Sequence, residues 1–386
     1  MDKAKSPILA ERVASLGPPP ADARPAGGYM YDGTFFLLES KAHALDEEVV
    51  VCVHGVGSYS YYYEAMTAHL IEAGLTVLRY DLFGRGYSDY PLSSPEEAFT
   101  GQAHVAQLRG LLTFLGLQDR IHLVGHSMGG AVAALYAAQY GAGSLSLLAP
   151  AGLIDLKGLK HVRRFRCLHG LVRSSLRRGQ ESFFRADFHN TQSQVCITTV
   201  AAMLAMQRKR PFLFEASWHC LLHGPLSATD AQVALIDRGI PVFLAWGERD
   251  KTVPMVPNMA RWRSLLQGRG KGGGQGQDQT QQGQGQAQTE ASLRDTYTDA
   301  DAVVTERVYE SAAHAFHVEY ASVVNADLLT FLRGNLGDRG QNVEHSGVQS
   351  GGQSGDQSTT NPIQESTAEQ SAAQHGIAHS TTHSTI

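Results

Sequence analysis

Residues 121–130 read Ile-His-Leu-Val-Gly-His-Ser-Met-Gly-Gly, and this stretch decides the fold. The apolar run at 121–124 is typical of a strand buried on both faces, and the Ala-rich segment that follows predicts a helix. Glycines two positions before and two after Ser127 remove side chains that would collide in a sharp strand-to-helix turn. The pattern Gly-x-Ser-x-Gly in this context predicts a serine nucleophile. The alternative is a tight turn whose serine only caps the helix.

Strand and helix patterns alternate on both sides of this stretch. Short apolar runs predict strands at 48–53, 75–80, 121–124, 145–148, 240–246 and 302–308. Helical composition occupies 61–73, 103–115, 128–139, 254–266 and 318–332. The alternation predicts an α/β fold with a mostly parallel central sheet and helices on both faces. In such sheets the loops at the carboxyl ends of the strands build the site.

Three regions interrupt the alternation. One lies between two strands, has helical patches, and is interpreted as an inserted helical cap. A Gly/Gln-rich stretch at 268–298 is a low-complexity insertion. The Ser-, Thr-, Gln- and His-rich end cannot bury enough apolar surface to offset its ordering entropy. The chain then divides into an irregular leader, a first core segment, the cap, a second core segment with the insertion, and a disordered tail: 1–28, 29–152, 153–237, 238–335 and 336–386.

Composition excludes several classes of function. The 386 residues carry a net charge of −5, which gives no reason to expect nucleic acid as a partner. There is no run of eighteen apolar residues for a membrane span, and residues 1–17 lack the apolar stretch of a signal peptide. The cysteines are scattered without a Cys-x-x-Cys pair, so we expect structural thiols and a cytoplasmic location: Cys52, Cys167, Cys196 and Cys220.

A catalytic serine needs a base, and the base needs an orienting carboxylate. Residues 246–250, Trp-Gly-Glu-Arg-Asp, follow the fifth apolar run, where a carboxylate can reach the site. Asp250 is favoured as this acid. The rivals are a neighbour in the same motif, a residue after the fourth run, and a residue before the fifth run at the wrong end of the strand: Glu248, Asp155 and Asp237.

Residues 311–317, Ser-Ala-Ala-His-Ala-Phe-His, follow the last apolar run and supply the base. His314 falls on the loop and is favoured; His317, near the start of the next helix, is the alternative. The separation between Asp250 and His314 is long for one helix and one strand. The Gly/Gln-rich insertion accounts for the excess, so we expect it to bulge from the surface and leave the site intact.

Residues 54–57, His-Gly-Val-Gly, follow the first apolar run. Glycines let such a loop approach a substrate carbonyl closely. We expect the backbone N–H of Val56 and that of Met128, at the start of a helix, to form an oxyanion hole. His54 is interpreted as a brace for the loop rather than a proton carrier.

These motifs together resemble the α/β-hydrolase superfamily, and more narrowly its lid-bearing branch of monoacylglycerol lipases and small-molecule esterases. The resemblance covers about 29–153 and 238–334. It implies a triad of Ser127, Asp250 and His314. It also implies that the Asp-Leu-Phe-Gly-Arg-Gly-Tyr-Ser-Asp stretch at 81–89 is mostly structural. Ala313 departs from the usual glycine before the histidine, which restricts that loop. Related dehalogenases and epoxide hydrolases carry Asp at the position of Ser127.

The expected function is a serine hydrolase that cleaves a carboxylic ester, such as a monoacylglycerol, through an acyl-enzyme. No metal or organic cofactor is required. An acyltransferase with the same triad and a non-catalytic binding protein remain as alternatives. The sequence leaves open the acyl chain, the leaving group, the choice between ester, amide, thioester and C–C bonds, and the oligomeric state.

The first part of the cap is strongly basic with apolar residues interleaved. An amphipathic surface of this kind meets a membrane or an anionic lipid. A solvated helix face with its apolar side on the core explains the same pattern and is favoured. The basic residues are Lys157, Lys160, Arg163, Arg164, Arg166, Arg173, Arg177, Arg178 and Arg185.

Overall fold

The computed structural model describes residues 12–13, 15–16, 27–41, 48–119, 121–155, 162, 165, 167, 169–227, 229–237, 239–267 and 304–336. The insertion at 268–298 and nearly all of the leader and the tail lie outside these residues. So does most of the basic stretch at 157–166.

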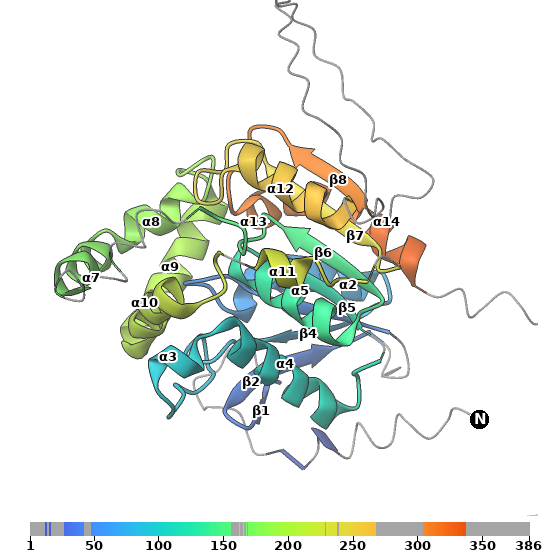
Figure 1. Ribbon diagram of the computed structural model, residues 1–386, viewed down its shortest axis with the longest axis horizontal. Coiled ribbons are helices and arrows are strands. Elements are labelled where there is room, and N and C mark those ends of the chain that lie inside the picture. Colours follow the sequence, from blue (N-terminus) through green and yellow to red (C-terminus); the bar gives the residue numbers. More distant parts are fainter. Residues whose placement is uncertain are drawn as a thin grey trace, which may run out of the picture. The chain divides into compact units, whose positions relative to one another are not determined.

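An eight-stranded sheet in the order β1-β2-β4-β3-β5-β6-β7-β8 forms the centre of the fold (Figure 1). All neighbours from β4 to β8 pair in parallel, while β1–β2 and β2–β4 pair antiparallel. The prediction of a mostly parallel sheet is confirmed. The strands are β1 (Tyr29–Tyr31), β2 (Thr34–Glu39), β3 (Val49–Val53), β4 (Thr76–Tyr80), β5 (Ile121–His126), β6 (Ser144–Leu148), β7 (Val242–Gly247) and β8 (Val304–Tyr309).

The hairpin of β1 and β2 was not among the strands expected from the sequence. Its two-residue turn is Asp32-Gly33, with φ of 45° and 70°. This is the turn chemistry that suits a tight hairpin, because both central residues need a positive φ. Phe35 and Phe36 after the turn are completely buried, so the hairpin extends the core beyond β4.

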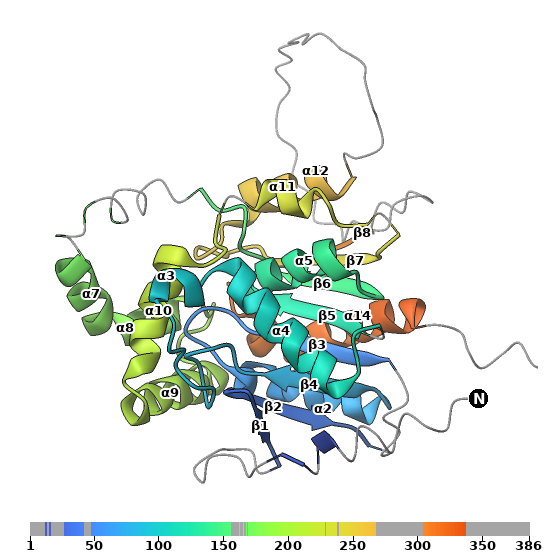
Figure 2. The ribbon, with the colours of Figure 1, turned by 60° about the horizontal axis from the view of Figure 1, so that its bottom comes forward.

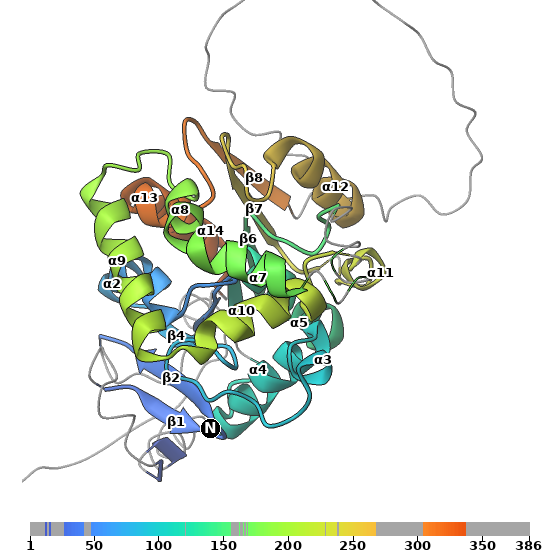
Figure 3. The ribbon, with the colours of Figure 1, turned by 90° about the vertical axis from the view of Figure 1, so that its left-hand side faces the viewer.

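Helices cover both faces of the sheet. Figure 2 and Figure 3 show α2 and α14 on one face and α4, α5, α11 and α12 on the other. The helices, with one 3-10 turn, are η1 (Ser60–Tyr63), α2 (Glu64–Glu72), α3 (Pro95–Ala98), α4 (Gly101–Leu115), α5 (Met128–Tyr140), α7 (His169–Arg178), α8 (Gln180–Ala186), α9 (Gln194–Lys209), α10 (Phe212–His223), α11 (Asp230–Val233), α12 (Met255–Gln267), α13 (Phe316–Glu319) and α14 (Ala321–Asn335).

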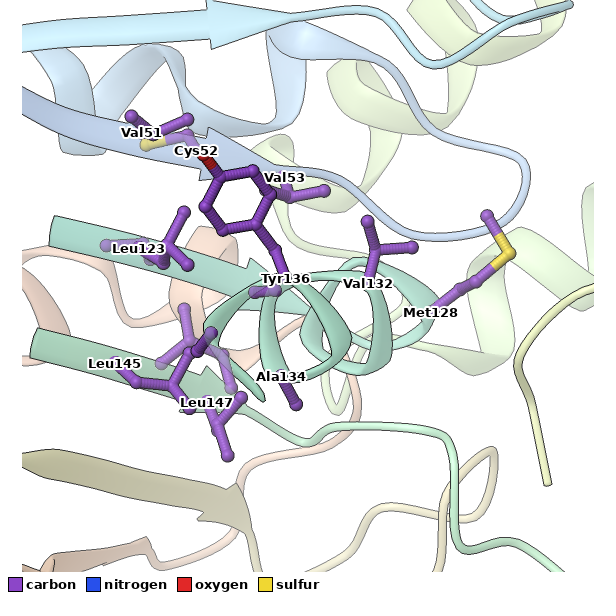
Figure 4. Close-up of a cluster of buried hydrophobic side chains, with 14 of the residues drawn as sticks. Val51, Cys52, Val53, Leu123, Met128, Val132, Ala134, Tyr136, Leu145 and Leu147 are labelled. Atoms are coloured by element: carbon purple, nitrogen blue, oxygen red, sulfur yellow. The ribbon is translucent and has the colours of Figure 1, made fainter. Parts of the chain in front are cut away.

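Helix α5 is the central helix of the core and carries small or apolar residues on every side. Its first ten residues are all buried, as expected of a helix enclosed by a sheet and other helices. Figure 4 shows Val132 and Tyr136 of α5 beside Val51 and Val53 of β3 and Leu123 of β5. The N-terminus of α5 is therefore fixed relative to the ends of β3 and β5.

The described residues between β6 and β7 form helices α7 to α11 and contain no strand. Two apolar clusters join this segment to the sheet and to the loops that follow its strands. In one, Phe184 and Phe188 pack with Tyr62 and Ala315. In the other, Met206 and Leu213 pack with residues that include Phe35 and Tyr87. The segment therefore rests on the loops that follow the strands, although its standing as a separate cap domain stays a prediction.

Helix α7 contrasts with the rest of this segment because none of its residues is buried. Leu171 is 70% exposed and lies on the same helix as Arg177 and Arg178. Among the described residues, no helix is long and apolar enough to cross a bilayer. All four cysteines are free thiols, and only Cys167 is exposed.

Candidate active site

Ser127 occupies the turn between β5 and α5. Its backbone has φ 55° and ψ −123°, a conformation that non-glycine residues adopt only under strain. A Cβ on Gly129 would lie 1.9 Å from the carbonyl oxygen of Val53, so only glycine fits there. The Ser127 side chain makes no capping hydrogen bond to α5. The geometry thus matches the predicted elbow and disfavours a serine that only caps the helix.

The loop after β3 lies directly against this elbow. A Cβ on Gly55 would come within 2.9 Å of the Ser127 Cβ. The next residue, Val56, is the predicted oxyanion donor. Met128 is the first residue of α5 and is buried, and at that position its N–H has no acceptor within the helix. The oxyanion roles of Val56 and Met128 stay predictions.

His54 braces the loop, as the sequence suggested. Its Nδ1 donates to the Gly55 carbonyl (2.9 Å), and its Nε2 accepts from the Leu82 N–H (3.0 Å). Burial lowers the pKa of His54 to about 3, so the ring is neutral and both nitrogens are already engaged. This arrangement leaves the imidazole no proton to exchange with a substrate.

The 81–89 loop is held by Asp81, in agreement with a structural role. The two carboxylate oxygens of Asp81 accept the N–H groups of Ser60 (2.7 Å) and Tyr87 (2.8 Å). The side chain is completely buried. Burial raises the pKa of Asp81 to about 6, although these two hydrogen bonds oppose the rise.

Asp250 follows β7 and makes three hydrogen bonds through its carboxylate. Oδ1 accepts the backbone N–H groups of Thr252 (2.9 Å) and Val253 (2.8 Å). Oδ2 accepts from His314 Nδ1 at 2.7 Å, and both side chains are buried. Two backbone donors thus fix the carboxylate plane, and the remaining oxygen orients the imidazole.

The rival carboxylates lie elsewhere. Glu248 accepts the N–H of Ser311 at 3.0 Å, on the exposed side of the loop. Asp237 accepts the N–H of Gly239 and is exposed, and Asp155 is also exposed. Of these four acids, Asp250 is the one whose carboxylate bonds His314.

The acid loop and the histidine loop are joined through their backbones. The N–H of Glu248 donates to the Tyr309 carbonyl (3.0 Å), and the N–H of Arg249 donates to the Ala312 carbonyl (2.8 Å). A Cβ on Gly247 would lie 2.3 Å from the Ala313 carbonyl oxygen. The two loops approach this closely because residue 247 has no side chain, and this contact brings Asp250 to His314.

The environment of His314 makes it a stronger base than a free histidine. Burial lowers the pKa of His314, but the charge and hydrogen bond of Asp250, together with the charge of Asp187, outweigh it, so the pKa is raised above 6.5. Because Nδ1–H donates to Asp250, Nε2 is left as the basic nitrogen. His314 is only 3% exposed, so this nitrogen is shielded from bulk water.

Two further histidines surround His314. His126, the residue before Ser127, donates from Nε2 to the His314 carbonyl at 3.0 Å, which places the elbow against the histidine loop. His317, the alternative base, lies against His126, with ring centroids 4.2 Å apart and the ring planes tilted by 41°. Burial lowers the pKa of His317 to about 3 and that of His126 well below its usual value. Both rings are neutral, and neither ring nitrogen of His317 has a hydrogen-bond partner among the described residues.

Asp187, at the end of α8, is a site residue that the sequence did not single out. Its carboxylate accepts the Thr252 hydroxyl at 2.6 Å, and its carbonyl accepts the N–H of Ala315 at 2.7 Å. It contacts the loops of both Asp250 and His314. No motif marks it in the sequence, since it lies in the cap segment, far along the chain from the loops of both Asp250 and His314.

No metal site emerges from this geometry. Among the described residues, no group of three or more His, Cys, Asp or Glu side chains is placed to hold a metal ion.

Comparison with known proteins places this site in a family. A family model described as "Alpha/beta hydrolase family" matches residues 50–326, which include Ser127, Asp250 and His314. The chain belongs to the alpha/beta hydrolase family. The chain also resembles a proline iminopeptidase of Lactobacillus delbrueckii subsp. lactis, with 37% identity over 98 residues. That match covers 25% of this chain and 33% of the relative. The chain thus spans about a third of the length of that relative.

Other alpha/beta hydrolases match over longer stretches. A 2-hydroxy-6-oxo-6-phenylhexa-2,4-dienoate hydrolase of Comamonas testosteroni is 27% identical over 221 residues, 54% of this chain and 73% of the relative. Among solved structures, a thermophilic esterase of Thermogutta terrifontis superposes with a TM-score of 0.58 and 18% identity, covering 82% of this chain and 97% of that one. At that identity the structural likeness shows the fold alone.

Proposed function

We propose that this alpha/beta hydrolase is a serine hydrolase that cleaves a carboxylic ester through an acyl-enzyme intermediate. The observation that carries the proposal is the buried hydrogen bond between His314 Nδ1 and Asp250 Oδ2, 2.7 Å long, beside a strained serine elbow at Ser127. A strained serine, an oriented imidazole and a buried carboxylate are the three parts that nucleophilic acyl transfer needs.

The reaction follows from these parts. His314 Nε2 removes the Ser127 proton as the hydroxyl oxygen attacks the acyl carbonyl. Asp250 stabilises the imidazolium that forms. The N–H groups of Val56 and Met128 stabilise the oxyanion, each by about 3–4 kcal/mol. The imidazolium then gives its proton to the leaving alcohol, and water releases the acid by the reverse sequence of proton transfers.

A carboxylic ester, such as a monoacylglycerol or another acyl ester, is the proposed substrate class. This choice rests on the resemblance of the motifs around Ser127, Asp250 and His314 to lid-bearing esterases and monoacylglycerol lipases. The resemblance to a proline iminopeptidase favours a second candidate, cleavage of an amide after an amino-terminal proline. The same serine, histidine and oxyanion donors serve both bonds, so the assay must compare them directly.

The first test uses a fluorophosphonate probe on the purified full chain. We expect wild type to be labelled and Ser127→Ala not to be labelled. Equal labelling of both would move the nucleophile elsewhere, and no labelling of either would favour a non-catalytic binding protein.

A substrate panel then separates the candidates. It contains p-nitrophenyl esters of increasing chain length and proline p-nitroanilide. Ester turnover that is lost in Ser127→Ala supports the proposal, whereas turnover of the anilide alone supports the peptidase. Adding glycerol or a simple alcohol as acceptor and measuring the transfer product distinguishes an acyltransferase.

A further inference from the structure

The end of α8 is hydrogen-bonded to the loops that carry Asp250 and His314. The Asp187 carbonyl accepts the N–H of Ala315, the residue after His314, at 2.7 Å. Two residues further along are held as well, because the N–H groups of His189 and Asn190 each donate to the Glu319 carboxylate at 2.7 Å. The segment 187–190 is thus fastened to the loop and short helix that follow His314.

The Asp187 side chain is linked to the loop of Asp250 through Thr252. The Thr252 hydroxyl donates to Asp187 Oδ1 at 2.6 Å, while its backbone N–H donates to Asp250 Oδ1 at 2.9 Å. One residue therefore bridges two carboxylates, one in the cap segment and one in the core. Asp187 is 8% exposed, so its charge acts on its neighbours with little screening by water.

We propose that Asp187 is a positioning residue for His314, a second carboxylate that holds the imidazole as the base and couples the cap segment to the site. The inference rests on the proposed serine hydrolase function. In this proposal two carboxylates support the imidazole of His314. Asp250 bonds the imidazole directly, and Asp187 acts through its charge and through Thr252 and Ala315.

The charged and titratable groups around His314 support this role. Asp250 faces it from the loop after β7, Asp187 from the end of α8, His126 from the end of β5 and His317 from α13. The two histidines are neutral because burial lowers their pKa values. The carboxylates are therefore the groups that oppose the effect of burial on His314.

The protonation state of Asp187 depends on the same contacts. Burial raises the pKa of Asp187; the charge of His314 and the Thr252 hydroxyl lower it, and the charge of Asp250 raises it further. Removing the Thr252 hydroxyl should therefore favour the protonated, uncharged form. Two different substitutions, one at residue 187 and one at residue 252, are then expected to weaken the same electrostatic support.

The test is the pH dependence of fluorophosphonate labelling of the full chain. The rate rises as His314 loses its proton, so its midpoint reports the pKa of His314. Asp187→Asn keeps an acceptor for the Thr252 hydroxyl but removes the charge. Because a nearby negative charge favours the imidazolium, its removal should move the midpoint to lower pH by roughly 0.5–1 unit. The plateau rate should fall less than about tenfold, since Asp250 still orients the ring.

The matched control is Glu181→Gln. Glu181 lies on the same helix, is exposed, and pairs with Arg185 at 2.9 Å, so its loss removes one charge from the cap without touching the site. It should leave the midpoint unchanged. An Asp187→Asn midpoint equal to that of wild type, or an equal shift in Glu181→Gln, overturns the proposal.

Thr252→Val covers the case in which Asp187→Asn does not fold, as judged by circular dichroism. It removes the hydroxyl donor and keeps the backbone N–H to Asp250. Its midpoint should also move to lower pH, and an unmoved midpoint rejects the role of Asp187. If wild type itself shows no labelling, the proposed function fails and this inference fails with it. That result differs from a labelled wild type with an unshifted variant, which rejects Asp187 alone.

Discussion

Replacing Asp250 by Asn tests the proposed triad most directly, because the structure dictates how the new side chain must lie. The backbone N–H groups of Thr252 and Val253 both donate to Oδ1 of Asp250. An asparagine keeps its carbonyl oxygen on these two donors, so its amide NH₂ faces His314 Nδ1. That nitrogen must then accept a hydrogen bond, and the proton moves to Nε2, the nitrogen that has to act as the base.

The size of the effect follows from this change of tautomer. The wrong tautomer and the missing charge in a serine triad lower the rate by about 10⁴-fold, which corresponds to roughly 5.5 kcal/mol of lost transition-state stabilisation. The pKa of His314 also falls, since burial lowers it and the charge of Asp250 no longer opposes that effect. The variant should still fold, because its carbonyl oxygen replaces the wild-type acceptor for both backbone donors.

The assay is kcat/KM for a p-nitrophenyl ester, measured from pH 5 to pH 9 on wild type, Asp250→Asn and Glu248→Gln. Glu248 is the neighbouring carboxylate in the same loop, and its side chain accepts the Ser311 N–H on the exposed side of that loop, so its variant should stay within about threefold of wild type. A loss smaller than tenfold in a folded Asp250→Asn protein refutes the assignment. A large loss in Glu248→Gln instead would transfer the role to that residue.

Four other outcomes are expected. Because the pKa of His314 is raised and the base must be neutral, the acidic limb of the wild-type pH–rate profile should lie above pH 6.5; a limb below pH 6 contradicts this. Gly247→Ala should lower stability by about 1–3 kcal/mol in thermal unfolding, since its Cβ would lie 2.3 Å from a carbonyl oxygen of the His314 loop. Helix α7 has no buried residue and exposes Leu171, so we expect it, against the interpretation favoured from the sequence, to pellet the protein with anionic vesicles in sedimentation, and less so in Leu171→Ser with Arg178→Gln. Equal, negligible pelleting with neutral and anionic vesicles excludes this contact. Deleting 271–298 should leave ester turnover unchanged, and a large loss would give that segment a role in the site.

The serine elbow could be predicted from the sequence because the residues that determine it are close together in the chain. A buried strand, two spaced glycines and a small-residue helix lie within about twenty residues around Ser127, and each has its own signature. The choice between Asp250 and Glu248 was harder, because both follow the same strand. It depends on the Thr252 and Val253 N–H groups that receive Oδ1, and this geometry is visible only in three dimensions.

The hairpin of β1 and β2 was missed although its signal was present. Asp32-Gly33 is a strong two-residue turn pattern, and aromatic and apolar residues flank it on both sides. The Tyr-Met-Tyr segment at 29–31 is short and half-buried, so it lacks the longer apolar run that marks a buried parallel strand. Asp187 was missed for a different reason. Its importance comes from tertiary contacts with Thr252 and Ala315, which no local pattern encodes.

The hydrogen bond between Asp250 and His314 forms across a long interruption in the sequence, the Gly/Gln-rich insertion. Helix α12 ends at Gln267 and β8 begins at Val304, yet β7 and β8 pair in register from Val242 with Val304 to Gly247 with Tyr309. Lengthening a loop eightfold adds only about 2 kcal/mol of closure entropy, because the cost grows with the logarithm of length. The pairing of β7 with β8 and the hydrogen bonds between the loops of Asp250 and His314 therefore set the distance between these two residues, and the number of residues between them in the sequence does not.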